Sequence, residues 1–133
     1  MKYFLFGVSF LLMLIVSCTK QANDGDWDDN IKLSVKSAEF SASGDSITIK
    51  TGGNWWWVTD ISINGTDFYH FPDVNLESEV YLILCDDICV ERRDKNTLFI
   101  RAAQNPQNVK RLITIGLQAG DYFDRVSITQ KEK

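Results

Sequence analysis

The chain has 133 residues, enough for one domain with a single core, and its 18 acidic and 14 basic side chains give a formal net charge of −4. Its Lys and Arg residues form no cluster of the kind that binds the phosphates of nucleic acids. The composition therefore argues against a nucleic-acid partner and against attachment to a membrane through a basic patch.

The segment 1–17 predicts an export signal that is not part of the fold. Lys2 precedes an apolar run from Tyr3 to Val16, which is shorter than the ~20 residues of a membrane-spanning helix. An A-x-A-like cleavage site is absent, and the run ends at Ile15-Val16-Ser17-Cys18. This ending resembles the lipobox of bacterial lipoproteins. The resemblance implies cleavage before Cys18 and acylation of that residue, whose acyl chains would anchor the protein in a membrane.

Residues 18–30 are polar and acidic without periodicity, which predicts a flexible tether. Aspartates alternate from Asp24 to Asp28 as in a calcium loop. However, Asp29 stands where the turn glycine belongs, and Val35 stands where the bidentate Glu belongs, so we expect no metal site. Acidic residues directly after a lipidated Cys also resemble the surface-export signals of Bacteroidetes lipoproteins. That resemblance implies an outer-membrane lipoprotein that is exposed at the cell surface.

Residues 31–133 show the two-residue alternation of β-strands and no sustained helical period. We expect strands at 31–35, 47–49, 55–63, 79–84, 90–92, 97–102, 111–117 and 122–130, with an irregular connection from Thr66 to Leu76. Phe40 breaks the alternation of the first strand, which predicts a bulge or a switch of sheet near Ser37-Ala38. Short strands at this spacing predict a single all-β domain, an antiparallel β-sandwich of about seven or eight strands.

The strand with three consecutive tryptophans is expected to be central. Successive strand side chains point to opposite faces. The almost wholly apolar set, expected to be buried, is Trp55, Trp57, Thr59, Ile61 and Ile63, and the mixed set is Trp56, Val58, Asp60 and Ser62. On this parity Trp56 is the exposed tryptophan. The alternative is that Trp56 packs beneath the 66–76 connection, because tryptophan is usually largely buried.

The end of the chain resembles BACON domains. The resemblance rests on Asn105, the run Arg111-Leu-Ile-Thr-Ile115, a Gly-Asp turn and the run Val126-Ser-Ile-Thr-Gln130. Gly53-Asn54-Trp55 also matches the family's tryptophan strand, which follows a Gly- or Asn-containing turn. The resemblance covers roughly Ile31 to Gln130. It implies an immunoglobulin-like β-sandwich of a carbohydrate-binding module found in Bacteroidetes.

Five residues are candidates for a glycan site, in which aromatic rings stack on sugar faces and polar groups bind hydroxyls. Trp56, Tyr69 and Phe71 are the candidate stacking residues, and Asp67 and Asn64 are the candidate hydrogen-bonding residues. The 66–76 connection also carries the single His of the chain, and such connections often carry function. Its aromatic side chains could equally form a small cluster that caps the core.

Cys85 and Cys89 are separated by three residues. Because an exported protein enters an oxidising compartment, we expect a disulfide between them, with two free buried thiols as the alternative. A thioredoxin-like site needs C-x-x-C, and a structural zinc site needs four ligands. Neither is present, so no metal or cofactor is expected.

Enzymatic activity is not expected, because the chain has one His and lacks the nucleophile, metalloprotease and phosphate-loop motifs. The preferred hypothesis is a lipid-anchored, non-catalytic surface module that binds glycans such as dietary or mucin polysaccharides. The alternative is a structural or protein-interaction accessory domain that contacts an outer-membrane protein and has no carbohydrate affinity.

Overall fold

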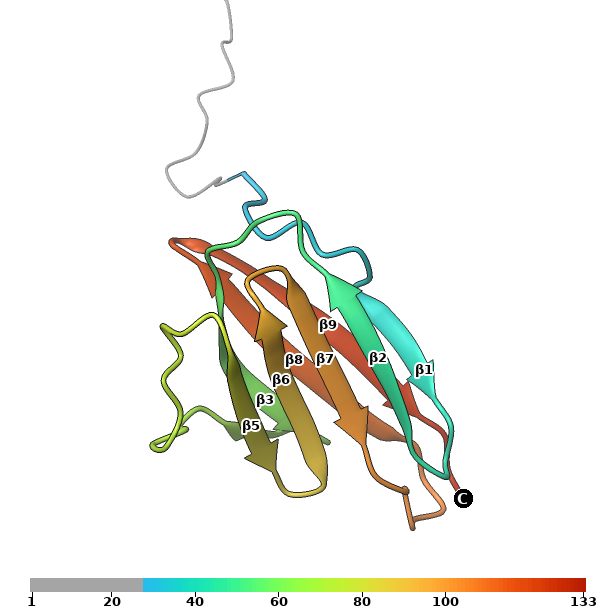
Figure 1. Ribbon diagram of the computed structural model, residues 1–133. Helices are drawn as coiled ribbons and strands as arrows, with labels where there is room; N and C mark the ends of the chain where they lie inside the picture. The colour runs from blue at the N-terminus through green and yellow to red at the C-terminus, as the bar shows by residue number, and fades with distance from the viewer. Residues whose placement is uncertain (1–27) are drawn as a thin grey trace, which may run out of the picture.

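The computed structural model describes residues 28–133, which form nine β-strands and no helix (Figure 1). The strands are β1 (Ser37–Phe40), β2 (Asp45–Lys50), β3 (Trp57–Ile63), β4 (Thr66–Phe68), β5 (Tyr81–Cys85), β6 (Ile88–Asp94), β7 (Thr97–Ala102), β8 (Arg111–Ala119) and β9 (Tyr122–Gln130). The expected signal peptide 1–17, the lipidation site Cys18 and most of the tether 18–30 lie outside the described residues. Within the described part, no helix is long and apolar enough to cross a membrane.

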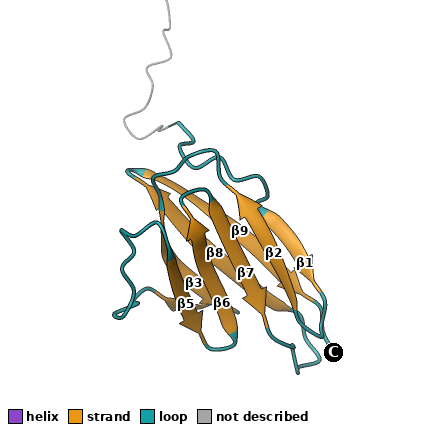
Figure 2. Ribbon diagram, in the orientation of Figure 1, coloured by secondary structure: helices purple, strands orange, loops and turns teal. Residues whose placement is uncertain are grey.

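The strands form two packed sheets (Figure 2). One sheet has the order β1-β9-β8-β3-β4 and the other has the order β2-β7-β6-β5. Neighbouring strands run antiparallel, except that β1 pairs with β9 in parallel. The predicted β-sandwich is confirmed. It has nine strands because β1 forms after the predicted strand 31–35 and takes its place, and a short strand, β4, forms inside the connection that the sequence predicted to be irregular.

The core consists of the inward side chains of both sheets. In β8 and the second half of β9, alternate apolar residues are fully buried, as the alternation predicts: Ile113, Ile115, Leu117, Val126 and Ile128. Facing them from the other sheet are Ile49, Ile83, Val90, Leu98 and Ile100. Each such side chain contributes about 1.5–3 kcal/mol on burial, so the alternating apolar residues are the main stabilising feature of the fold.

The predicted strand 31–35 is wrong. Only Leu33 makes a β-bridge, to Thr51 just after β2, and the backbone of Lys32 has a φ of 53° that interrupts an extended conformation. Asp29 Oδ1 accepts hydrogen bonds from the Ile31 and Lys32 backbone N–H groups and so stabilises a turn. The predicted switch of sheet is confirmed. Leu33 lies beside Thr51, which follows β2 of one sheet, and the chain then enters β1 of the other sheet.

The predicted parity of the tryptophan strand is also wrong at its start. Trp56 is 1% exposed and belongs to the core, whereas Trp55 is 66% exposed. The register of β3 against β8 shifts between Val58 and Asp60, which leaves Thr59 as an extra residue. This β-bulge reverses the alternation. Val58 and Ile61 are therefore both buried although they are three residues apart.

The predicted disulfide between Cys85 and Cys89 is wrong as well, and both residues are free thiols. The chain turns back at Asp86-Asp87, so Cys85 pairs with Ile88 and Cys89 pairs with Leu84. Side chains alternate along each strand of this hairpin. Cys85 therefore lies in the core with Ile88, and Cys89 points to the outer face of the sheet beside the exposed Leu84. Two thiols on opposite faces cannot form a disulfide.

Candidate functional site

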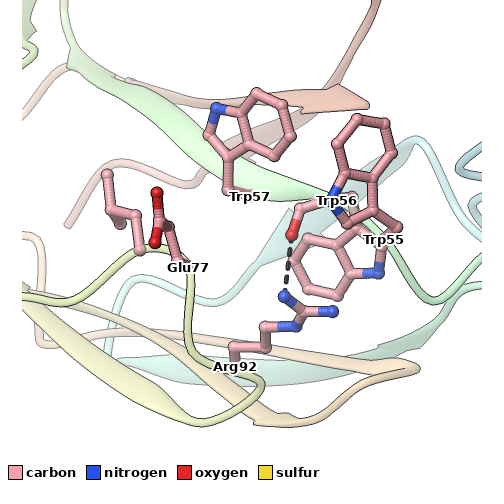
Figure 3. Close-up of a pocket in the computed structure, with 6 residues that line it drawn as sticks. Trp55, Trp56, Trp57, Glu77 and Arg92 are labelled. Atoms are coloured by element: carbon pink, nitrogen blue, oxygen red, sulfur yellow. Dashed lines mark hydrogen bonds between the residues drawn. The ribbon is translucent and has the colours of Figure 1, made fainter. Parts of the chain in front are cut away.

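A pocket of about 490 Å³ opens where β3 meets the β4–β5 connection and β6 (Figure 3). Its size falls within the range of small-molecule sites, roughly 300–1,000 Å³. The residues that line it come from three separate parts of the chain: Trp55, Trp56 and Trp57, then Leu76 and Glu77, then Arg92. The pocket is therefore mainly aromatic, with one carboxylate and one guanidinium in its wall.

Trp55 and Trp57 form the exposed aromatic part of the pocket. Their ring centroids lie 5.5 Å apart and their planes meet at 69°, an edge-to-face arrangement that makes a corner. Trp55 also lies against the β8–β9 turn, where a Cβ added to Gly120 would sit 3.4 Å from the indole ring. Trp57 is half-buried. The two indoles thus contact each other, and the ring of Trp55 remains largely open to solvent.

Trp56 is the fixed wall behind this corner. Its Nε1 donates to Thr51 Oγ1 at 3.0 Å and to the Lys95 carbonyl oxygen at 3.1 Å. The guanidinium of Arg92 lies over its ring, 4.2 Å from the centroid, as in a cation–π contact. Because its N–H is already satisfied and its ring is covered, Trp56 contributes shape and rigidity rather than a stacking face.

Arg92 is 3% exposed and holds the backbone around the tryptophans. Its Nη1 donates to the carbonyl oxygens of Trp56 at 2.8 Å and of Ser78 at 3.3 Å. Its Nη2 donates to the carbonyl oxygens of Asn54 at 2.7 Å and of Lys95 at 3.1 Å. Burial lowers the pKa of the guanidinium, but an arginine side chain still remains charged in a protein.

Arg92 also makes a hydrogen bond that a neighbouring strand would otherwise make to the tryptophan segment. β4 pairs with β3 only at Ile61–Ile63, so the first half of β3 has no strand neighbour on that side. There the Val58 N–H donates to the hydroxyl oxygen of Tyr81 at 3.0 Å, while Arg92 meets the carbonyl oxygen of Trp56. Burial raises the pKa of the Tyr81 hydroxyl. Two side chains of the opposite sheet therefore complete the hydrogen bonds of this edge.

The turn between β6 and β7 positions the loop before the tryptophans. Asn96 Nδ2 donates to the carbonyl oxygens of Thr51 and Gly53, at 3.1 and 3.0 Å. Asp94 fixes the turn itself, because its carboxylate accepts from the Asn96 N–H and the Thr97 hydroxyl. These two hydrogen bonds hold the pKa of Asp94 below its ordinary value. The aromatic corner is thus organised before any ligand binds.

Glu77 brings a carboxylate to the opposite side of the pocket from Trp55 and Trp56 (Figure 3). Its backbone N–H donates to Asn75 Oδ1 at 3.1 Å, a local turn that presents the side chain. The side chain is exposed. Within residues 28–133 its carboxylate makes no hydrogen bond or ion pair in the structure, so both oxygens can accept hydrogen bonds from a ligand.

The structure does not bring the five predicted glycan-site residues together. Tyr69 is 67% exposed and its hydroxyl donates to Asp67 Oδ2 at 2.7 Å, which lowers the pKa of Asp67 and raises that of Tyr69. Phe71 packs partly against the core and, with His70, lines a different pocket of about 310 Å³ beside β5. Of the five predicted residues, Trp56 alone lines the tryptophan pocket.

Asn64 has a structural role. It adopts a left-handed φ of 49°, followed by Gly65 at 83°, and these two residues form the tight turn between β3 and β4. Its N–H donates to the Leu112 carbonyl oxygen, and its Oδ1 accepts from the Leu112 N–H, both at 2.9 Å. The side chain is therefore used by the fold.

The prediction of Trp56 as the exposed platform is wrong, because the bulge places its two neighbours outside. Sequence reasoning also missed Glu77 and Arg92 as pocket residues. Arg92 lies at an inward position of β6, two residues after the buried Val90, and a charged residue at an apolar position was a usable signal. Glu77 gave no local signal, since it reaches the pocket from an irregular connection.

Metal ligation is not evident in the described part of the chain, where no group of three or more His, Cys, Asp or Glu side chains is close enough to hold an ion. Because both Nη atoms of Arg92 donate to backbone carbonyl oxygens, the pocket offers a ligand aromatic faces and one free carboxylate. Such a site can bind through stacking and hydrogen-bond acceptance.

Comparisons with known proteins identify the fold. No family model matches the sequence, and no curated protein matches it. The chain is similar to the NMR structure of a protein from Bacteroides thetaiotaomicron, with a TM-score of 0.64 and 20% identity over 87% of this chain and 98% of that one. A chaperone–tip adhesion subunit complex of Csu pili from Acinetobacter baumannii matches at a TM-score of only 0.38 and 9% identity. The first similarity shows a fold shared with a Bacteroides protein.

Proposed function

We propose that this protein is a non-catalytic module that binds glycans in the tryptophan pocket, and that Trp55 is its main stacking residue. The observation that carries the proposal is the corner formed by the exposed Trp55 and the half-buried Trp57, which faces the free carboxylate of Glu77. The apolar face of a pyranose stacks on an exposed indole, and polar groups beside it bind the hydroxyls.

A binding role is favoured over catalysis by the chemistry of the pocket residues. Arg92 and Trp56 direct their side-chain donors to protein acceptors, so they position the wall. Glu77 is the single carboxylate that lines the pocket, and His70 lines a different one. Hydrolysis of a glycosidic bond ordinarily needs two carboxyl groups that flank the bond.

Affinity electrophoresis of the full chain in gels that contain polysaccharides tests the proposal. Wild-type protein should be retarded in at least one gel of a panel of plant and mucin polysaccharides. Trp55→Ala should lose about tenfold in affinity, which is roughly the contribution of one stacked aromatic face, ~1.4 kcal/mol.

Tyr69→Ala is a matched control, because Tyr69 is as exposed as Trp55 but lies outside the pocket. We expect it to bind like the wild type. Both variants should unfold within about 0.5 kcal/mol of the wild type, since exposed side chains contribute little to stability. Equal loss of retardation in both variants would place the binding surface elsewhere, and no retardation of the wild type on any polysaccharide would refute glycan binding.

We further propose that the module is a lipoprotein of the BACON type, anchored through Cys18 in the outer membrane and exposed at the cell surface. The lipobox-like residues Ile15 to Cys18 and the fold shared with a Bacteroides protein support this proposal. Metabolic labelling with a radioactive fatty acid should label the wild type and not Cys18→Ser. Digestion of the protein by protease added to intact cells would support outward exposure, and protection would contradict it.

The second candidate function is an accessory domain that contacts an outer-membrane protein. It is favoured by β5, an edge strand with β6 as its one strand neighbour in the described residues. Val80, Leu82 and Leu84 on or beside this strand are exposed. Co-purification of a membrane protein that is lost in Leu82→Lys and kept in Trp55→Ala would favour this function over glycan binding.

A further inference from the structure

In the tryptophan pocket, the hydrogen-bond donors of Arg92 are not available to a ligand, whereas the acceptors of Glu77 are. Both Nη atoms of Arg92 donate to backbone carbonyl oxygens, two bonds from each atom. An arginine has five N–H groups, and these bonds use four of them. The fifth, on Nε, is enclosed by protein and has no partner in the structure. The one cation of the pocket wall therefore offers no accessible N–H group to a ligand.

The charge of Arg92 is also held away from the pocket opening. The side chain is almost completely buried, and no carboxylate of residues 28–133 forms an ion pair with it. Its charge is stabilised by carbonyl dipoles and by the face of Trp56. A ligand anion would have to displace these carbonyls to form the paired hydrogen bonds by which arginine recognises carboxylates and sulfates.

Glu77 has the opposite properties. It is exposed on the pocket wall, and the two oxygens of its carboxylate are free to accept hydrogen bonds. Two adjacent hydroxyls of a sugar can donate to the two oxygens of one carboxylate. A carboxylate or sulfate on a sugar would instead face a like charge.

From this distribution we propose that the pocket selects neutral sugars and excludes acidic ones. The inference rests on the proposed glycan function and names its ligand class. The sugar stacks an apolar face on Trp55 and donates hydrogen bonds from two neighbouring hydroxyls to Glu77. Uronic acids and sulfated sugars are rejected because the pocket presents an uncompensated acceptor and no free cationic donor.

The test compares retardation of the full chain on three kinds of polysaccharide. The neutral probes are mixed-linkage β-glucan and galactomannan, the acidic probes are polygalacturonate and chondroitin sulfate, and the aminated probe is chitosan. Wild-type protein should bind a neutral probe at least about tenfold more tightly than any acidic one, because a hydrogen bond to a charged group contributes ~1.5–3 kcal/mol. Glu77→Gln should lose about tenfold on the neutral probe.

Glu79→Gln is the matched control, because it removes the same charge from the same connection but does not line the pocket. It should bind the neutral probe like the wild type. Tighter binding of an acidic probe than of the neutral ones, with Glu77→Gln unaffected, would overturn the inference. If Trp55→Ala abolished that binding, glycan recognition by the pocket would still stand.

Preference for chitosan over both neutral probes would also overturn the inference, in favour of a cationic ligand held by the indoles and Glu77. Absence of binding to every probe would refute the proposed function itself. The two failures are therefore distinguishable in one set of gels.

Discussion

Two buried arginines lie near opposite ends of β6 and make different kinds of contact. Arg92, beside the β6–β7 turn, donates only to backbone carbonyl oxygens. Arg111 reaches the β5–β6 turn, where its Nη1 lies 2.8 Å from both carboxylate oxygens of Asp87. Its Nε and Nη2 also donate to Gln130 Oε1 at 2.9 and 2.6 Å.

Gln130 completes the second network. Its Nε2 donates to the carbonyl oxygens of Ser41 and Ala103, so it links β9 to the loops after β1 and β7. The residues Arg111 and Gln130 that carry the resemblance to BACON domains are therefore hydrogen-bonded partners at the other end of the sandwich. Their hydrogen bonds stabilise the fold, and neither residue lines the tryptophan pocket.

The comparison shows why the end of the sandwich with the tryptophan pocket keeps a carboxylate that is free for a ligand. At the Arg111 end, a carboxylate and an amide satisfy the cation, and the charges cancel locally. At the Arg92 end, the cation is satisfied by the backbone of the loops that carry the tryptophans. One side chain thereby joins these loops, and the nearby carboxylate of Glu77 stays free for a ligand.

The largest expected effect is that of Arg92→Met. The substitution keeps the aliphatic stem of the side chain but removes the Arg92 donor from four carbonyl oxygens, of which that of Lys95 keeps Trp56 Nε1, and it removes the contact with the Trp56 ring. We expect the free energy of unfolding in urea to fall by about 3 kcal/mol. Arg93→Met is the control. Arg93 is exposed, with its guanidinium 3.6 Å from the Phe99 ring centroid, and its loss should cost less than about 1 kcal/mol.

A smaller effect is expected at the other end. Arg111→Met should lower the free energy of unfolding by about 2 kcal/mol, because Gln130 keeps its two backbone acceptors while Asp87 loses its partner. Asp87 is 38% exposed, so its charge can be solvated and Asp87→Asn should cost about 1 kcal/mol. A double-mutant cycle in urea gives their coupling. A coupling free energy near zero would show that the Arg111–Asp87 pair does not stabilise this end of the sandwich.

The smallest effect is a dependence on pH at the Arg92 end. Because the hydrogen bonds from Asn96 and Thr97 lower the pKa of Asp94 in the folded state, protonation favours the unfolded chain. The stabilisation is complete above the unfolded pKa of about 4 and is lost as the pH falls through the lower folded value.

Urea unfolding at pH 7 and pH 3 measures this contribution. Other aspartates with lowered pKa values, such as Asp45 and Asp124, lose stabilisation in both proteins, so the difference between wild type and Asp94→Asn isolates Asp94. The wild type should lose more stability on acidification than the variant. Identical losses would mean that the Asp94 carboxylate does not stabilise the turn.

Much of the fold could be predicted because strand alternation is written into short stretches of sequence. β8 follows the apolar pattern throughout and β9 follows it from Val126, and the predicted strands 90–92 and 97–102 fall within β6 and β7. The errors occur where the tertiary structure departs from the strand pattern that the local sequence predicts. The bulge at Thr59 exchanged the roles of Trp55 and Trp56, and the turn at Asp86-Asp87 separated Cys85 from Cys89.

By itself, the sequence determined an all-β domain, because the spacing of apolar residues dictates which faces must leave water. It also predicted the strand that follows the tryptophans, which begins at Trp57 and not at Trp55. Only the tertiary structure decided which indole faces solvent, since one extra residue in β3 reverses the pattern. It alone brought Glu77 and Arg92 to that strand, because residues 20 or more positions apart meet through sheet packing, which no local periodicity encodes.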